Sequence, residues 1–261
     1  MIIGFLGTGA ISEAIIRGLC EESGYQGPIL VTQRSVERSS RLAHDYPQVE
    51  VIDNNNALVE RSEWVFLGVL PEQVTDVLNA LTFRPEQKLI SLAAGISLAQ
   101  IQALAPPCDQ VIRAIPMPPI EFGLGPVALC PADTPLEAFF SRIGTAVSVS
   151  DEQQFNLFGA TSALMADYFD QIATVTTWMA SHGMDSSTAA RYTTALYHAL
   201  SALTTKQSPD ALQMMSEQCQ TPGGLNEQFL IERAERGAND SLRDGLDQIL
   251  TRLESVARNS R

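Results

Sequence analysis

The sequence predicts an α/β protein of two domains, the first built on a mainly parallel sheet and the second built of helices alone. Short apolar runs alternate with helical patterns from residue 2 to about residue 130, which is the spacing of parallel strands joined by crossover helices. From Phe155 to Leu203 the chain is instead rich in Ala, Leu, Met and Thr at helical spacing. We therefore place the two domains at residues 1–150 and 151–261.

The first domain contains seven apolar runs that we interpret as buried strands. They are Ile2–Leu6, Ile29–Thr32, Val49–Ile52, Trp64–Val69, Leu89–Leu92, Val111–Ile115 and Gly125–Cys130. Helical patterns separate most of them. These run from about Ile11 to Leu19, from Val36 to His44 and from Ala57 to Ser62, and two more begin at Pro71 and Ser97, the latter a candidate N-cap.

The second domain is predicted to be helical because no proline occurs between Leu136 and Ser208. Pro209 and Thr221–Gly224 interrupt the pattern, and a final amphipathic helix is expected from about Asn226 to Arg258. These helices are very apolar. They are expected to form a dimer interface or, as the alternative, an ordinary bundle core.

Composition excludes several classes of protein. With 45% hydrophobic and 18% charged residues the chain of 261 residues is a globular protein, and its net charge of −13 argues against binding to nucleic acid or anionic membranes. Cys20, Cys108, Cys130 and Cys219 form no CxxC pair, so we expect no metal site and reduced thiols. No leader or membrane-spanning run is recognisable, and a soluble, cytoplasmic protein is expected.

A glycine pattern lies between the first strand and the first helix. Gly7-x-Gly9-x-x-Ser12 is placed where the first glycine permits a tight turn and the second lets a pyrophosphate approach the N–H groups of the helix N-terminus. Ser12 is small enough for the third position. The pattern predicts dinucleotide binding, against the alternative of a purely structural turn.

The end of the second strand predicts which dinucleotide binds. An acidic residue there would bind the 2′-hydroxyl of NAD, but the sequence has Gln33-Arg34-Ser35, with Arg38 one helical turn further. Arg34 and Ser35 suit a 2′-phosphate, so NADP (NADPH) is expected in preference to NAD. In the alternative interpretation, Arg34 and Arg38 are only solvated charges at a helix start.

With these residues placed, the chain resembles the pyrroline-5-carboxylate reductase family over nearly its whole length. The resemblance rests on short blocks in a specific order and spacing. They are Gly4-Phe-Leu-Gly-Thr-Gly-Ala-Ile11, Val69-Leu-Pro71, Ser91-Leu-Ala-Ala-Gly-Ile96, Arg113-Ala-Ile-Pro-Met-Pro118 with Gly123 and Gly125, and Thr221-Pro-Gly-Gly224.

The resemblance implies an N-terminal Rossmann domain, a helical dimerisation domain that intertwines with a second subunit, and hydride transfer from NAD(P)H to a cyclic imine, giving proline. It also implies the residues that contact the coenzyme. These are Gly7, Thr8, Gly9, Ala10, Ile11, Arg34, Ser35, Asn55, Val69, Leu70, Pro71, Ala93 and Ala94.

The chain departs from the family mainly where the substrate would bind. Leu70 replaces a usual Lys, Met117 a usual Asn, and the block Gly-Ser-Gly-Pro-Ala-Tyr aligns onto Ser162–Asp167, which places Ala163 and Asp167 where the family has Ser and Tyr. Leu225-Asn226 replaces two threonines. The residues expected at the substrate are Met117, Ala163, Asp167, Gly223, Gly224 and Leu225, with Ser162, Thr221 and Asn226 as candidate catalytic donors.

Imine reduction requires little from side chains, because the nicotinamide supplies the hydride and the protein has to align it, exclude water and hold the substrate carboxylate. Asn226 has capping of the last helix as its alternative role, and Asp167 could pair with an iminium or be an exposed helix carboxylate. His198 is expected in the core and His44 at a solvated helix end.

Three functions follow from these observations. The first is an NADP-dependent reductase of pyrroline-5-carboxylate in proline biosynthesis. The second is a paralogue acting on a different imine or oxo acid, suggested by Ala163, Asp167 and Asn226. The third is a catalytically silent NADP-binding protein.

Overall fold

The computed structural model describes residues 1–33 and 35–259 and divides into two compact units. Unit 1 comprises Met1–Ala160 together with the C-terminal segment from Leu250, and unit 2 comprises Thr161–Ile249. The last helix of the chain begins in unit 2 and ends in unit 1. Within the described residues, no helix is both long and apolar enough to cross a membrane.

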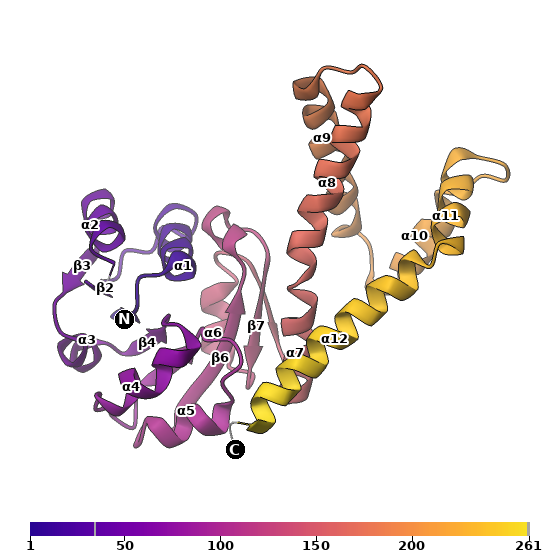
Figure 1. Cartoon of the computed structure of the whole chain (residues 1–261). Coiled ribbons are helices and arrows are strands. Elements are labelled where there is room, and N and C mark those ends of the chain that lie inside the picture. The colour runs from indigo at the N-terminus through magenta and orange to yellow at the C-terminus, as the bar shows by residue number, and fades with distance from the viewer. Residues whose placement is uncertain (34, 260–261) are drawn as a thin grey trace. The chain divides into compact units, whose positions relative to one another are not determined.

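Unit 1 is built on an eight-stranded sheet with the strand order β3-β2-β1-β4-β5-β6-β7-β8 (Figure 1). The strands are β1 Ile3–Leu6, β2 Ile29–Thr32, β3 Val49–Ile52, β4 Trp64–Leu67, β5 Lys88–Ser91, β6 Gln110–Pro116, β7 Pro126–Cys130 and β8 Thr145–Ser148. All neighbouring pairs are parallel except β6 and β7. The predicted mainly parallel α/β sheet is confirmed, and its chain order reverses between β1 and β4.

Helices cover both faces of this sheet. They are α1 Ala10–Glu21, α2 Val36–Asp45, α3 Asn55–Arg61, α4 Val74–Asn79, α5 Leu98–Leu104, α6 Thr134–Phe140 and α7 Glu152–Thr161, with 3₁₀ turns η1 Pro71–Gln73 and η2 Pro118–Phe122. Ser97 caps α5 as predicted, in a capping box with Gln100. The helix expected at Pro71 begins as the 3₁₀ turn η1 and continues as α4.

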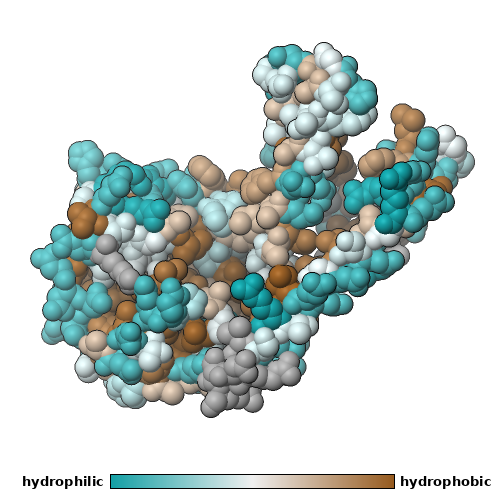
Figure 2. Space-filling view, in the orientation of Figure 1, coloured by the Kyte–Doolittle hydropathy of each residue, from teal (hydrophilic) through white to brown (hydrophobic). Residues whose placement is uncertain are grey.

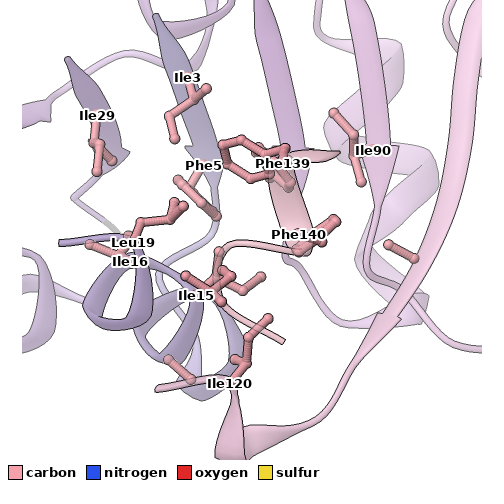
Figure 3. Close-up of a cluster of buried hydrophobic side chains, with 14 of the residues drawn as sticks. Ile3, Phe5, Ile15, Ile16, Leu19, Ile29, Ile90, Ile120, Phe139 and Phe140 are labelled. Atoms are coloured by element: carbon pink, nitrogen blue, oxygen red, sulfur yellow. The ribbon is translucent and has the colours of Figure 1, made fainter. Parts of the chain in front are cut away.

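The core has two halves because side chains of a strand alternate between faces. Ile3 and Phe5 of β1 face α1 and α6, and Figure 3 shows them among Ile15, Phe139 and Phe140. Phe5 stacks on Phe66 of β4 with ring centres 4.7 Å apart. The opposite face of the same strands packs against α3, α4 and α5 in a second cluster. The sheet is thus packed on both faces, and the loops that follow its parallel strands emerge at its carboxyl edge.

Unit 2 is helical, as predicted. It consists of α8 Leu164–Ser181, α9 Ser186–Thr204, η3 Pro209–Ala211, α10 Leu212–Gln218, α11 Leu225–Glu235 and most of α12 Ala238–Asn259. The single last helix expected from Asn226 to Arg258 is wrong, because Gly237 adopts a φ of +70° and separates α11 from α12.

The helices of unit 2 bury little of their apolar surface. The 18-residue helix α8 has no buried residue, and α9 buries only Ala189 and Thr193. The large side chains of Phe169 and Trp178 are 59% and 61% exposed. Figure 2 shows hydrophobic surface among the hydrophilic residues of these helices.

Candidate functional site

A cavity of about 500 Å³ lies at the carboxyl edge of the sheet in unit 1, on both sides of the point where the strand order reverses. The loops that follow β1, β2, β4 and β5 form its walls. The lining residues are Gly7, Thr8, Gly9, Ala10, Ile11, Ser35, Arg38, Gly68, Val69, Leu70, Pro71, Gln73, Leu92, Ala93 and Ala94. This volume is typical of a small-molecule or cofactor site.

The turn between β1 and α1 requires glycine at its first position. Gly7 has a φ of +93°, and a Cβ there would come within 2.6 Å of the carbonyl oxygen of Gly68. The turn is also attached to β2, because Thr32 Oγ1 accepts from the Gly7 N–H at 3.0 Å and the Thr32 carbonyl accepts from Thr8 Oγ1 at 2.8 Å. The turn after β1 is therefore in close contact with Gly68 in the loop after β4 and is hydrogen-bonded to β2.

Gly9 has a different reason to lack a side chain. Its φ of −79° suits any residue, and a Cβ would come no closer than 3.7 Å to Gly68 O, so the packing of the chain does not require glycine. Gly9 is the N-cap of α1 and makes no side-chain cap, and the first helical hydrogen bond runs from Glu13 N to Gly9 O. The N–H groups of the first turn are left to an anion in the cavity.

Ser12, the third position of the glycine pattern, is completely buried against the loop after β4. A Cβ on Gly68 would collide with Ser12 Oγ. Ser12 Oγ has no hydrogen-bond partner among the residues that the structure describes. A small residue at position 12 and a glycine at position 68 thus allow α1 and β4 to pack closely beneath the cavity.

Of the two residues expected at a 2′-phosphate, Ser35 lines this cavity, and so does Arg38 one helical turn further. Arg34 lies outside the described residues. Arg38 Nε is 3.3 Å from Glu13 Oε2. Burial opposes ionisation of Glu13, but hydrogen bonds from Arg41 and Arg17 outweigh it and lower the pKa of its carboxyl below the usual range.

A smaller cavity of about 230 Å³ adjoins the first and shares Gly7 and Val69 with it. Leu6, Thr32, Gln33, Asp53, Asn55 and Val77 complete its lining. Asn55, expected at the coenzyme, lies here rather than in the larger cavity. Of the predicted coenzyme contacts, all but Asn55 and the undescribed Arg34 line the larger one.

Sequence reasoning missed Gly68, Gln73 and Leu92 in this lining. Gly68 carried a signal, because it directly precedes Val69 at the end of an apolar strand, where a glycine indicates close approach of another backbone. Leu70 lines the cavity with 58% of its surface exposed.

The residues expected at the substrate are divided between the two units. Met117, the N-cap of η2, is half-buried in unit 1 and does not line the coenzyme cavity. Ala163 and Asp167 line a cavity of about 610 Å³ inside unit 2, together with Gln171 and Arg233. Asp167 is exposed, and its Oδ2 accepts from Gln171 Nε2 at 2.6 Å. Ser162, which precedes these residues, is half-buried and does not line this cavity.

Three polar groups in and beside the loop before α11 are hydrogen-bonded within the chain. Gly223 N–H donates to Glu227 Oε2 at 2.6 Å, and Gly224 N–H donates to the carbonyl of Thr221 at 2.7 Å. Asn226 Nδ2 donates to the carbonyl of Cys219 at 2.8 Å. Asn226 is not an N-cap, because α11 begins one residue earlier with Gly224 at the N-cap position.

Leu225, at the start of α11, is 85% exposed and is not among the residues lining the cavity of unit 2. The two histidines considered above are both exposed. The sequence predicts an exposed position for His44, as observed. The buried core position predicted for His198 is wrong for the single chain. No cluster of three potential metal ligands occurs within residues 1–33 and 35–259.

The chain matches a family model described as "NADP oxidoreductase coenzyme F420-dependent" over residues 2–95, the part that contains β1 to β5 and the coenzyme cavity. It is 25% identical to the pyrroline-5-carboxylate reductase of Haemophilus influenzae over 98% of this chain and 97% of that protein.

The fold of the chain is similar to that of solved pyrroline-5-carboxylate reductases. The 1-pyrroline-5-carboxylate reductase of Streptococcus pyogenes has a TM-score of 0.83 at 24% identity, over 98% of each chain. The pyrroline carboxylate reductase of Plasmodium falciparum with NADP bound has a TM-score of 0.82 at 15% identity, also over 98% of each chain. The resemblance predicted from the sequence is confirmed, since the chain is similar to pyrroline-5-carboxylate reductases over nearly its whole length.

Proposed function

We propose that this protein is an NADPH-dependent imine reductase that reduces 1-pyrroline-5-carboxylate to L-proline. The observation that carries the proposal is the combination of whole-length similarity to reductases of that name with a cavity that fits a dinucleotide. This fit is supported by the structure, because the packing of the chain does not require a glycine at position 9. The absence of a side chain at Gly9 leaves the N-terminus of α1 open to a pyrophosphate.

In this function the coenzyme supplies hydride to the C=N carbon, and the residues of the chain hold the reactants. The first turn of α1 binds the pyrophosphate with backbone N–H groups. The loops after β4 and β5, with Val69 and Ala93 in the cavity wall, orient the nicotinamide half and exclude water from it. When the imine nitrogen is already protonated, hydride transfer to the carbon gives the neutral amine directly, so no side chain has to supply a proton in that step.

The preference for NADP over NAD belongs to the same proposal. Ser35 and Arg38 in the cavity wall offer a hydroxyl and a cation to a 2′-phosphate. Arg34 is the further cation suggested by the sequence. The matched control is NADH, which lacks the 2′-phosphate and should therefore bind more weakly.

A second candidate function is the reduction of a different imine or oxo acid. It is favoured by the substrate half of the chain, where Ala163 and Asp167 share a cavity with Arg233 and where Leu225 and Asn226 replace threonines of the family. Ser162, Thr221 and Asn226 remain the proposed catalytic donors. Met117, Ala163, Asp167, Gly223, Gly224 and Leu225 remain the proposed substrate contacts.

We also propose the division of labour between residues 1–150 for the coenzyme and 151–261 for dimerisation and substrate, in a homodimer or larger homo-oligomer. The apolar exposed faces of α8 and α9 support dimerisation. A cytoplasmic location stays a prediction.

The test is turnover by the purified protein. Oxidation of NADPH is followed with 1-pyrroline-5-carboxylate, and proline is measured as the product. We expect turnover with a lower KM for NADPH than for NADH. Tight NADPH binding without turnover of this substrate would contradict the first function, and a panel of imines and oxo acids would then separate the second from a silent NADP-binding protein.

A further inference from the structure

A carboxylate at the start of α7 joins three elements of unit 1. Glu152 Oε1 accepts a hydrogen bond from Arg113 Nη1 at 2.7 Å and a second one from the backbone N–H of Leu98 at 2.8 Å. Arg113 lies in β6, Leu98 is the first residue of α5 and Glu152 the first of α7. One oxygen therefore links a strand to the N-termini of two helices.

Burial makes this link specific. The side chain of Arg113 is only 8% exposed, and its guanidinium lies 4.7 Å from the centre of the Phe155 ring in α7. A buried guanidinium without a counter-ion is costly, so Arg113 holds the Glu152 carboxylate in one place. The Leu98 N–H is one of the N–H groups that a helix start leaves without an internal acceptor, and Glu152 supplies that acceptor.

The Leu98 N–H is also the end of a loop that forms part of the coenzyme cavity. Residues 92–97 connect β5 to α5, and Ala93 and Ala94 line the cavity. At the start of the loop, the Leu92 N–H donates to the carbonyl of Leu67 at 3.0 Å. The loop is thus held by β4 at one end and by the Ser97 capping box and Glu152 at the other.

The sheet order indicates which half of a dinucleotide this loop meets. The strand order reverses between β1 and β4, and a dinucleotide lies across that point with its adenosine half toward β2. The loop after β5 is on the opposite side. It therefore faces the nicotinamide half, where alignment with the substrate is decided.

We propose that Arg113 and Glu152 are positioning residues of the coenzyme site, which hold the loop 92–97 against the nicotinamide half of NADPH. The inference rests on the proposed function, because it takes NADPH as the ligand. Neither residue lines the cavity, so both act through the loop.

The chain contains a matched control at the other end of β5. Asp133 accepts from Lys88 Nζ with both carboxylate oxygens at 2.6 Å and from the backbone N–H of Leu136 in the first turn of α6 at 2.8 Å. Asp133, like Glu152, joins a buried cation to a helix start. Lys88 is the first residue of β5, whereas the coenzyme loop follows the last.

The experiment compares Glu152→Ala with Asp133→Ala, measuring the Kd of NADPH and of 2′,5′-ADP by titration and the Tm of each variant. The ligand 2′,5′-ADP has the adenosine half but no nicotinamide. Loss of Glu152 should weaken NADPH about tenfold, which corresponds to one charge-assisted hydrogen bond, and change the Kd of 2′,5′-ADP by less than about twofold. Loss of Asp133 should lower the Tm and leave the Kd of NADPH and the Kd of 2′,5′-ADP unchanged.

Equal weakening of both ligands, the same weakening in the Asp133 variant, or an unchanged NADPH affinity in Glu152→Ala would overturn the inference. Should the alanine variants not fold, Glu152→Gln and Asp133→Asn replace them, and a smaller loss confined to NADPH is then expected. If the wild-type protein bound neither ligand, the proposed function itself would fail and this inference with it.

Discussion

At the scale of single residues, the two glycines of the first turn make different contributions. Gly7→Ala should both destabilise the fold and abolish NADPH binding, because an L-residue at a φ of +93° costs roughly 1–2 kcal/mol and its Cβ would clash with Gly68 O. Gly9→Ala should leave the Tm nearly unchanged, since its backbone is extended and its Cβ has room, yet weaken NADPH strongly. Thermal unfolding and fluorescence titration of both variants check this contrast.

Equal effects of the two substitutions on Tm would contradict the assignment of Gly9 to the ligand rather than to the fold.

Local sequence signals suffice to predict the coenzyme half of the site. The glycine turn, the strand before it and the helix after it are consecutive, so their geometry is predictable from the sequence. The substrate half has no such local signal, because its candidates come from segments around residues 117, 163 and 225 that are far apart in the sequence.

At the scale of elements, Glu13 connects α1 to α2. Its side chain is 14% exposed, and its carboxyl oxygens lie 2.7 Å from Arg41 Nη2 and 3.3 Å from Arg38 Nε. Since its pKa is lowered on folding, its stabilising contribution is complete above the usual value of 4.5 and is lost as the pH falls through the lower native value. Glu13→Gln should therefore reduce the free energy of unfolding at pH 7, and the difference should shrink below about pH 4.

Urea unfolding at a series of pH values measures this difference. The exposed Glu37 in the first turn of α2 is the control, and Glu37→Gln should change the free energy of unfolding little at any pH. A Glu13→Gln effect that persisted unchanged below pH 4 would mean that the side chain acts through packing rather than charge.

The elements that sequence patterns missed lack a strong local signal, each for its own physical reason. β8 was missed because Thr145–Ser148 alternates exposed and half-buried residues at the sheet edge instead of forming an apolar run. The short helix α6 has Asp133 at its N-cap and Pro135 in its first turn, and both residue types are equally typical of turns. The single helix expected from Asn226 to Arg258 contains Gly237, whose left-handed backbone ends α11. Buried strands with continuous apolar runs, by contrast, were all predicted.

At the scale of the whole molecule, the exposed apolar faces of unit 2 require an explanation. A subunit that leaves Phe169 and Trp178 of α8 about 60% exposed is unlike a stable monomer, which rarely shows large contiguous apolar patches. The coenzyme cavity, in contrast, is formed by residues of unit 1 only. Coenzyme binding and assembly should therefore be separable by substitution.

Light scattering after size exclusion should give at least twice the mass of one chain for the wild-type protein, since a second copy would bury these faces. Phe169→Asp should reduce the measured mass to that of one chain. Phe122→Asp, which replaces a similarly exposed phenylalanine in unit 1, should leave the mass unchanged. Because the cavity belongs to unit 1, the monomeric variant should still bind NADPH but lose turnover. A monomeric wild-type protein, or a Phe169→Asp variant that dissociates and yet turns over normally, would show that the helical unit does not complete the active site through a second subunit.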